Sequence, residues 1–421
     1  MQRRDLLCAA AAAAALSGCG DTSRLPTLPD SLRGQPVFSD LPEDSRIVLD
    51  SHSDEVLARI ARQALEREMA FVRSGGREDL GSADFLAISG GGENGAFGAG
   101  LLTAWSRMGT RPEFKAVTGI STGALMAPSA FLGPAYDKDL EDFYTRTSEA
   151  DIMTSRGLAT ALFSDSLYNP QPLLRTIRGY MTDAVLEAIA REYNVKGRLL
   201  FVATTNLDVP VGVLWNIGAI AASASPRKTE LIARVLLASA SIPGAFPPVM
   251  IDIEVDGQHF QEMHVDGGTV AQVVLYPPSF GGGDVGQILQ AADPAMVRLL
   301  RQRRRRLFVI RNSRPGPDPS TVGRSTLEIV ERAVSTLINT QGIGDLYQLY
   351  LLSQRDGIDF NAAYIPQSFS DRLDRPFDTA YMRKLYALGS QEMLESKAWH
   401  KTPPGYDPTP FHSILQSALR R

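Results

Sequence analysis

Short apolar runs that read as strands alternate along this chain with longer segments of helical periodicity. The strand-like runs are bounded by polar residues and lie at 85–88, 199–203 and 307–310. The helical patterns lie at 50–71, 97–107, 123–132, 172–192, 228–240 and 325–340. Strands separated by helices favour a mostly parallel sheet, because parallel neighbours need a crossover connection that covers a face of the sheet. We therefore predict an α/β fold with a mostly parallel central sheet.

The charge balance and the cysteines exclude several classes of protein. The chain has 43 Lys and Arg residues against 47 Asp and Glu residues, a formal net charge of -4. No global basic field therefore recruits nucleic acid, and we expect no nucleic-acid partner. The two cysteines, Cys8 and Cys19, both lie at the N-terminus, so the body holds no cysteine metal site and no structural disulfide. We expect neither a metal nor another cofactor.

The N-terminus has the pattern of an export signal. Two arginines precede an apolar stretch from Leu6 to Leu16 that is too short to span a bilayer permanently. The following Ser17-Gly18-Cys19 completes a segment similar to the bacterial lipobox, in which the cysteine thiol takes a diacylglycerol before cleavage ahead of it. We expect residues 1–18 to be a lipoprotein signal peptide and Cys19 to be lipidated. A plain secretory signal with an incidental Cys19 is the alternative.

This N-terminal reading sets the expected domain organisation and location. A flexible tether rich in Pro, Ser and Asp would cover 19–45, and one domain with a C-terminal helical extension would cover 46–421. The membrane partner would be reached through the N-terminal lipid anchor, in the cell envelope and facing the periplasm. Gly20 lacks the aspartate often linked to inner-membrane retention, which mildly favours the outer membrane. The sequence carries no indication of an oligomeric state.

A glycine-rich segment follows the first strand-like run and precedes a helical pattern. It reads Ser89-Gly90-Gly91-Gly92-Glu93-Asn94-Gly95. Glycines at such a turn leave backbone N–H groups and a helix N-terminus facing a negative ligand, so the segment is suited to an anion. Gly90, Gly92 and Gly95 also satisfy G-x-G-x-x-G, which makes a dinucleotide site the rival interpretation. A glycine-rich turn without a ligand is the remaining one.

A second glycine motif, Gly119-Ile120-Ser121-Thr122-Gly123, also lies between an apolar segment and a helix. G-x-S-x-G in that setting is the nucleophile elbow, a sharp turn that presents a serine hydroxyl at a helix N-terminus. By itself the pattern could be a chance match or a helix cap. It follows the glycine-rich loop by about 30 residues, the length of one βαβ unit, which places neighbouring parallel strand ends side by side. Oxyanion donors and the Ser121 nucleophile would then meet at one edge of the sheet.

Together these motifs resemble the patatin-like phospholipases. Members of that family have a glycine-rich oxyanion loop, then G-x-S-x-G, then D-G-G or D-G-A, which Asp266-Gly267-Gly268 matches in this chain. The segment from Ala238 to Pro248 is similar to the family's helix-to-loop connection toward the catalytic aspartate. The motifs occupy 85–268 in the family's order.

The resemblance implies a three-layer α/β/α sandwich that hydrolyses phospholipids, lysophospholipids or related lipid esters without a cofactor. It implies that Ser121 attacks the acyl carbonyl and that Asp266 removes the serine proton. The N–H groups of Gly90, Gly91 and Gly92 would hold the oxyanion. An aspartate of ordinary pKa, about 3.9, is a weak base, so close contact with the serine must compensate. Where the family usually carries Lys or Arg this chain has Asn94, which puts phospholipid as the substrate in question but not ester hydrolysis.

Other mechanisms and functions remain open on the sequence alone. Asp266 could belong to an ordinary Asp-Gly-Gly turn. A Ser-His-Asp triad of the α/β-hydrolase type would take its histidine from His400 or His412, while His264 reads as a strand side chain beside the site. A serine peptidase would use the same elbow, and a dinucleotide-binding oxidoreductase or a non-catalytic lipid-binding lipoprotein would use neither Ser121 nor Asp266.

Overall fold

The computed structural model describes residues 24–33, 35, 37–50, 52–155, 166–281, 294–316, 322–373, 375–407 and 409. Within these residues the strands form a nine-stranded sheet in the order β1-β7-β6-β3-β2-β10-β11, with the β8–β9 hairpin joined to β6 through β9. The strands of this sheet are β1 (Arg46–Val48), β2 (Ala83–Ile88), β3 (Ala116–Ile120), β6 (Leu199–Asn206), β7 (Val211–Asn216), β8 (Val249–Val255), β9 (Gln258–Asp266), β10 (Arg305–Arg311) and β11 (Asp359–Tyr364). β4 (Thr154–Ser155) and β5 (Tyr168–Asn169) pair separately.

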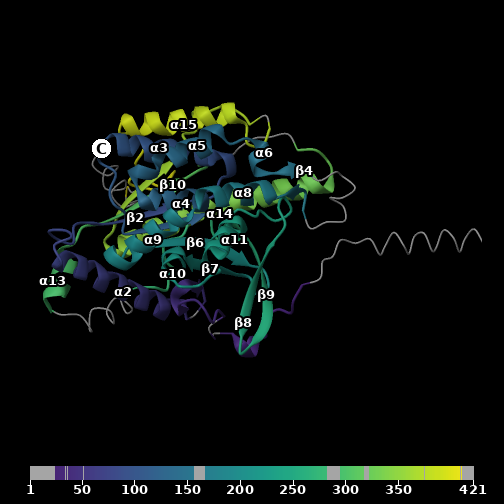
Figure 1. Cartoon of the computed structure of the whole chain (residues 1–421). Coiled ribbons are helices and arrows are strands. Elements are labelled where there is room, and N and C mark those ends of the chain that lie inside the picture. Colours follow the sequence, from purple (N-terminus) through teal and green to yellow (C-terminus); the bar gives the residue numbers. More distant parts are fainter. Residues whose placement is uncertain are drawn as a thin grey trace, which may run out of the picture.

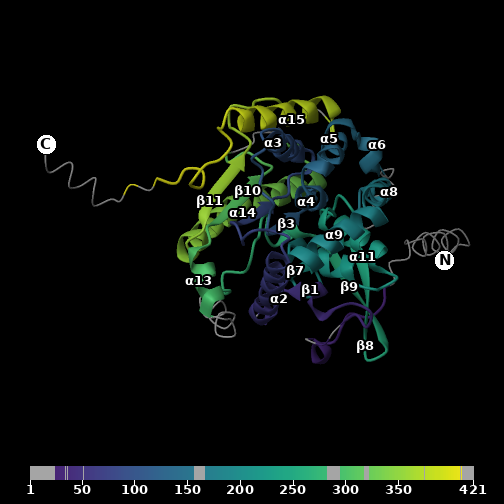
Figure 2. The same cartoon turned by 60° about the vertical axis from the view of Figure 1, so that its left-hand side comes forward.

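Helices cover both faces of the sheet (Figures 1 and 2). The helices are α2 (Ser53–Arg73), α3 (Gly95–Arg107), α4 (Thr122–Leu132), α5 (Asp137–Arg146), α6 (Glu149–Ile152), α8 (Gln171–Tyr180), α9 (Asp183–Lys196), α10 (Ile217–Ala222), α11 (Lys228–Ser239), α13 (Pro294–Gln302), α14 (Thr326–Asp356) and α15 (Thr379–Leu394). The 3-10 turns are η1 (Asp30–Leu32), η2 (Glu43–Ser45), η3 (Gly92–Asn94), η4 (Pro134–Tyr136) and η5 (Gly267–Thr269).

The alternation of side chains along the central strands places separate hydrophobic clusters on the two faces of the sheet. Leu86 and Ile88 of β2 face a core shared with α3, α4, α11 and α15. Ala87, between them in sequence, faces the opposite core, where α14 contributes Leu346 and Leu349. Successive strand residues point to opposite faces, so a strand buried on both sides reads as a continuous apolar run. The predicted α/β class, with helices on both faces of the sheet, is confirmed.

The sheet is parallel in its centre and antiparallel at one side. β6, β3, β2, β10 and β11 run parallel to one another. β7 pairs with β6 in the antiparallel direction, and β1 then pairs with β7. β9 also pairs with β6 in the antiparallel direction, beyond the point where β3 ends. Both sequence motifs, which follow β2 and β3, therefore lie at the same edge of the parallel part.

The described part of the expected tether is packed against the domain. Arg24 makes an ion pair with Asp208 at 2.7 Å, and the backbone N–H of Glu254 donates to the carbonyl of Val37 at 3.0 Å. Val37 and Phe38 are buried in the larger core. The described residues between 24 and 45 thus pack against the folded body at these points, where the sequence suggested a flexible tether over 19–45. The Pro and Ser residues of this segment favoured a tether, and nothing in the sequence indicated separately that Val37 and Phe38 pack into the core.

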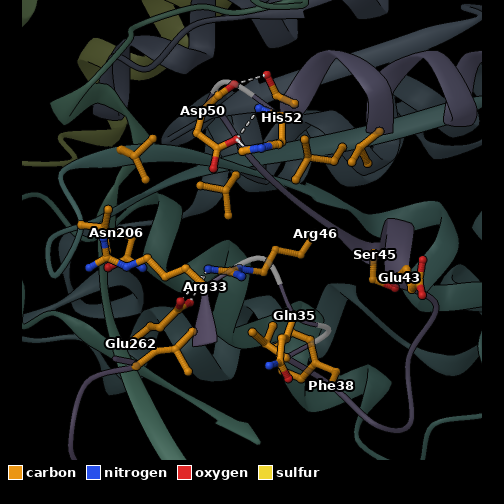
Figure 3. Close-up of a pocket in the computed structure, with 18 of the residues that line it drawn as sticks. Arg33, Gln35, Phe38, Glu43, Ser45, Arg46, Asp50, His52, Asn206 and Glu262 are labelled. Atoms are coloured by element: carbon orange, nitrogen blue, oxygen red, sulfur yellow. Dashed lines mark hydrogen bonds and ion pairs between the residues drawn. The ribbon is translucent and has the colours of Figure 1, made fainter. Parts of the chain in front are cut away.

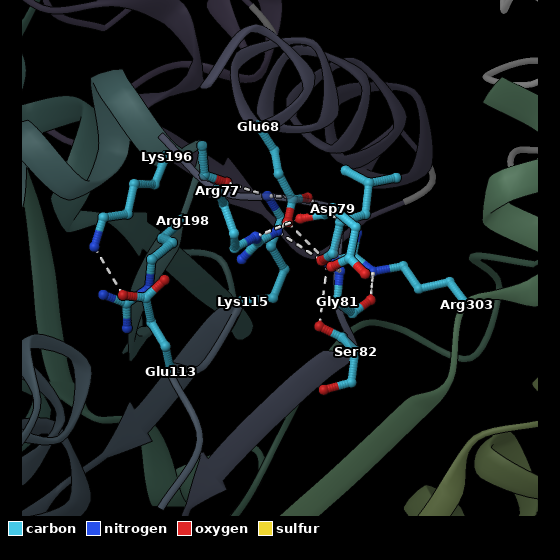
Figure 4. Close-up of polar contacts among 12 residues, drawn as sticks. Glu68, Arg77, Asp79, Gly81, Ser82, Glu113, Lys115, Lys196, Arg198 and Arg303 are labelled. Atoms are coloured by element: carbon cyan, nitrogen blue, oxygen red, sulfur yellow. Dashed lines mark hydrogen bonds and ion pairs between the residues drawn. The ribbon is translucent and has the colours of Figure 1, made fainter. Parts of the chain in front are cut away.

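An ionic cluster around Glu68 fastens α2 to the end of the sheet opposite the two motifs (Figure 4). The Glu68 carboxylate, 3% exposed, lies 2.9 Å from the Lys115 ammonium and 2.8 Å from the Arg303 guanidinium. Arg77 adds a third contact at 2.7 Å. Burial alone would raise the pKa of Glu68, but Arg303 and Lys115 hold it at about 2. Because Lys115 precedes β3 and Arg303 precedes β10, one carboxylate connects three elements.

Replacing Glu68 should therefore cost far more than replacing its neighbour on the same helix. Glu68→Gln leaves buried cations without a counter-charge, and we expect a loss of about 3 kcal/mol in the free energy of unfolding. Glu66→Gln removes an exposed contact with Arg62 at 4.0 Å, and we expect a loss below about 0.5 kcal/mol. Urea denaturation of both variants measures the difference. Equal losses would show that the cluster does not hold α2 in place.

Candidate active site

Ser121 lies at the sharp turn between β3 and α4. Its backbone has φ 55° and ψ -126°, a conformation that side-chain-bearing residues rarely adopt. The Ser121 N–H donates to the Ser239 hydroxyl at 3.0 Å, and that hydroxyl donates to the carbonyl of Ala203 at 2.7 Å. Ser239 thus ties the strained turn to the neighbouring strand β6. The G-x-S-x-G segment thus forms the sharp strand-to-helix turn that the sequence predicts, with Ser121 at its tip.

Gly123 shows why the elbow needs its second glycine. A Cβ atom at this position would lie 2.4 Å from the carbonyl oxygen of Ile88, the last residue of β2. Any larger residue would push α4 away from the strand end. The glycine therefore lets the helix begin directly beside the glycine-rich loop that follows β2.

Asp266 meets Ser121 because two strands share one edge of β6. β3 pairs with 199–203 of β6, ending at Ile120 opposite Ala203. β9 pairs with 204–206, ending at Asp266 opposite Thr204. The ends of β3 and β9 therefore meet, which brings the Ser121 side chain to the Asp266 carboxylate, and their interaction lowers the pKa of Asp266 against the larger effect of burial. The structure brings together the two residues that the motifs singled out.

The surroundings of Asp266 change its chemistry. Burial raises the pKa of Asp266 to about 7, although the hydrogen bonds from Ser121 and the Gly268 N–H act in the opposite direction. The Gly268 N–H lies 2.7 Å from Oδ1, and the Asp266 N–H is held by the carbonyl of Ser241 at 2.9 Å. The sequence suggested an ordinary aspartate that depends on contact alone. The buried carboxylate is instead a stronger base that still titrates near neutral pH.

The glycine-rich loop offers two backbone donors beside the elbow. Within the described residues, the N–H groups of Gly91 and Gly92 meet no hydrogen-bond acceptor. The N–H of Gly90 instead points to the carbonyl of Gln272 at 3.4 Å. A Cβ at Gly90 would lie 3.0 Å from the Ser121 Cβ, so this glycine allows the loop to approach the serine. Of the three glycines expected to hold an oxyanion, the geometry favours Gly91 and Gly92 as donors.

Two residues that support this loop escaped the sequence analysis. Asn312, fully buried, donates through Nδ2 to the carbonyl of Ser89 at 3.1 Å and accepts from the Gly98 N–H at 3.1 Å. Gln272 donates through Nε2 to the carbonyl of Gly268 at 3.2 Å, while its backbone carbonyl faces Gly90. Asn312 follows the strand-like run at 307–310, and a polar residue at the end of a parallel strand could have indicated a place at the site. Nothing in the sequence around Gln272 indicated its position beside Gly90.

Comparison with known proteins finds a family model that matches part of this chain. Residues 86–277 match the model of the patatin-like phospholipases. Over this segment the chain is similar to the patatin-like phospholipases. Among curated proteins, none matches this chain.

Two solved structures are similar to this chain. One is VipD from Legionella pneumophila, with 11% identity and a TM-score of 0.34 over 75% of this chain and 67% of that chain. The other is human GIVD cytosolic phospholipase A2, with 11% identity and a TM-score of 0.28 over 72% of this chain and 52% of that chain.

Elements beyond the matched residues complete the sheet and its core. β10 and β11 extend the sheet past β2, and Asn312 at the end of β10 supports the glycine-rich loop. α15 packs on α3, and Tyr381 of α15 donates its hydroxyl to the Asn94 side chain at 2.8 Å. The residue that stands where the family usually has a cation is therefore engaged by the C-terminal part. The described strands β10 and β11 thus belong to the same sheet, and α15 packs on the same core.

The described histidines near the sheet have other partners than the elbow. His264 is fully buried, with Nδ1 2.9 Å from the Thr204 hydroxyl and Nε2 3.1 Å from the Glu262 carboxylate. His400 pairs through its backbone with Ala362 of β11 and stacks on Tyr364, at the outer edge of the sheet. β2, β10 and β11 separate that edge from β3. His412 and Cys19 lie outside the described residues.

A cavity of about 960 Å³ lies away from the patatin-like site (Figure 3). The N-terminal segment, β1 and the start of α2 line it, with the Arg46–Glu262 ion pair on one wall. Neither Ser121 nor Asp266 contributes to its lining. The candidate active site, which contains these two residues, therefore lies outside this cavity.

Within the described ranges, no group of three or more His, Cys, Asp or Glu side chains could hold a metal ion. The helices described there include none that is long and apolar enough to cross a membrane.

Asp266→Asn should stabilise the protein in a pH-dependent way. The pKa of Asp266 in the folded protein, about 7, lies above the unfolded value of about 3.9, so the wild-type protein loses stability as the pH rises through this interval. The asparagine variant cannot ionise and avoids that loss. Its melting temperature minus that of the wild type should grow from pH 4 to pH 7 and then level off. Ser121→Ala, which keeps the carboxyl group, should retain the wild-type slope, and a pH-independent difference for Asp266→Asn would contradict the raised pKa.

Proposed function

We propose that this protein cleaves acyl ester bonds of phospholipids, lysophospholipids or related lipid esters through a Ser121–Asp266 dyad. The observation that carries the proposal is the meeting of Ser121, at the strained turn after β3, with the buried Asp266 at the end of β9. Burial raises the pKa of Asp266 to about 7, so this carboxylate is a stronger base than an exposed aspartate. The patatin-like family match supports lipid esters as the substrate class.

The acylation step follows from this geometry. Asp266 accepts the proton of Ser121 Oγ as this oxygen forms a bond to the acyl carbonyl carbon. The carbonyl oxygen becomes an oxyanion, which the N–H groups of Gly91 and Gly92 stabilise as preorganised donors. The tetrahedral intermediate collapses, and the leaving alcohol takes the proton from Asp266. An ester between Ser121 and the acyl group remains.

The deacylation step repeats the same chemistry with water. Water attacks the acyl carbon and gives a proton to Asp266, and Ser121 Oγ recovers this proton as the fatty acid departs. One carboxylate thus serves as base and then as acid in each half of the cycle. The arrangement needs no histidine, and His264 is held by Thr204 and Glu262.

Substitutions should separate the dyad from a triad. Ser121→Ala and Asp266→Asn should each lower kcat/KM for a p-nitrophenyl ester by at least about 10³-fold, because the nucleophile or the proton acceptor is lost. His264→Ala and His400→Ala should keep most of the activity. A panel of phospholipids, lysophospholipids and neutral esters then defines the substrate and the effect of Asn94. A folded His400→Ala or His412→Ala as inactive as Ser121→Ala would establish the triad instead.

We also propose that the mature protein is anchored in the cell envelope, facing the periplasm, through a lipidated Cys19, with the outer membrane favoured. The lipobox-like Leu16-Ser17-Gly18-Cys19 supports this. Cys19→Ser should move the protein from the membrane fraction to the soluble fraction of cells. Mass spectrometry of the purified protein should show residues 1–18 removed and Cys19 modified. An intact N-terminus or an unmodified Cys19 would refute the anchor.

A further inference from the structure

The long helix α14 has two halves with different surroundings. In its second half, Leu346, Leu349 and Leu352 are buried in the core beneath β2, β10 and β11. In its first half, none of the side chains that the structure describes between 329 and 341 is buried. In Figure 1 this helix extends beyond the strands on the right. An unsupported helix of about 15 residues is only marginally stable in water, so this half lacks the packing that normally stabilises a helix.

The first half of α14 is amphipathic. Val330, Val334, Leu337 and Ile338 recur at intervals of three or four and form one apolar stripe. Val330 is 52% exposed and Leu337 is 70% exposed. The sequence holds no charged residue between Arg332 and Asp345. The stripe is therefore an uncharged apolar surface that faces solvent instead of a core.

This stripe continues into the rim of the active site. Gln341, one turn after Leu337, donates through its side chain to the carbonyl of Val270. Val270 follows Asp266 by four positions and is itself 37% exposed. One residue further along α14, a Cβ at Gly342 would lie 3.2 Å from the side chain of Gln272, which contacts the loop after Asp266. The apolar stripe and the catalytic loop thus form one continuous edge of the molecule.

We propose that residues 326–341 of α14 lie on the lipid surface that supplies the substrate, with Val330 and Leu337 inserted among the acyl chains. The proposal rests on the proposed lipid-ester function. At 1.5 Å per residue these 16 residues extend about 24 Å, too short to cross a bilayer but suited to lie within its interface. From Val334 to Gln341 the segment carries no charged residue, so this part of the stripe can enter the interface without desolvating a charge. Docking through this edge would bring the loop after Asp266 close to the lipid surface. A substrate lipid molecule could then pass from that surface into the site.

Vesicle binding tests the docking independently of catalysis. The full chain carrying Cys19→Ser and Ser121→Ala has no lipid anchor and cannot turn over the lipid. We expect it to sediment with phosphatidylcholine vesicles, and we expect Leu337→Asp in this background to weaken binding at least tenfold. Leu394→Asp is the matched control, because this leucine is 53% exposed at the far end of α15 from Tyr381. At 1.5 Å per residue, the 13 positions between them place it about 20 Å along the helix from the residue that contacts Asn94. It should bind as the parent does.

A second readout guards against a structural effect of the aspartate. Leu337→Trp in the same background should show a blue-shifted emission when vesicles are added, because the indole enters a less polar medium. Unshifted emission, or equal vesicle binding by the parent and Leu337→Asp, would overturn the proposal. Self-association without lipid that Leu337→Asp abolishes would assign the stripe to a second copy of the chain and would equally overturn it.

Activity measurements separate this proposal from the proposed function. With Ser121 intact, Leu337→Asp should hydrolyse a soluble short-chain p-nitrophenyl ester within twofold of the parent rate and should hydrolyse vesicle lipid at least tenfold more slowly. A parent that binds vesicles through Leu337 but hydrolyses no ester would refute the function and keep the docking. If the parent and the Leu337→Asp variant hydrolyse the soluble ester at equal rates and the vesicle lipid at equal rates, the function is kept and the docking is refuted.

Discussion

The active site depends on one buried strand that pairs with two others along a single edge. β6 is longer than β3, and its last three residues accept β9 where β3 has ended. All eight residues of β6 are buried, so its register is fixed by packing on both faces. Because the two partner strands end opposite Ala203 and Thr204, the residue after β3 and the last residue of β9 must lie side by side. The contact between Ser121 and Asp266 is thus a consequence of sheet register.

The same arrangement explains how the protein maintains two unfavourable features. Ser121 has a positive φ, and Asp266 is a carboxyl group removed from water. A strained backbone and a buried carboxyl group persist only where several surrounding contacts hold them in place. The hydroxyl of Ser239 holds the N–H of Ser121, and the N–H of Gly268 satisfies one oxygen of Asp266. In the proposed dyad, burial supplies the benefit, because it raises the pKa of Asp266 to about 7 and makes the carboxylate a stronger base.

Local patterns predicted what lies within one strand–turn–helix unit. The glycine-rich loop and the elbow follow β2 and β3 as expected, because glycines and apolar runs act over a few residues. Contacts made by distant segments escaped prediction. The pattern at 172–192 reads as one helix, but Thr182 caps a new one after α8 ends at Tyr180. The docking of Val37, the support from Asn312 and the raised pKa of Asp266 depend on tertiary packing, which no local window contains.

The central claim is that a buried Asp266 activates Ser121, and the pH dependence of serine modification tests it most directly. A small soluble organophosphonate reacts with Ser121 without requiring the natural substrate, and mass spectrometry gives the labelling rate at each pH. Our account predicts that the rate rises with pH and reaches half of its maximum near pH 7, the pKa of Asp266. It also predicts that Asp266→Asn abolishes the rise. A midpoint near 4, or an unchanged profile in the asparagine variant, would contradict the account.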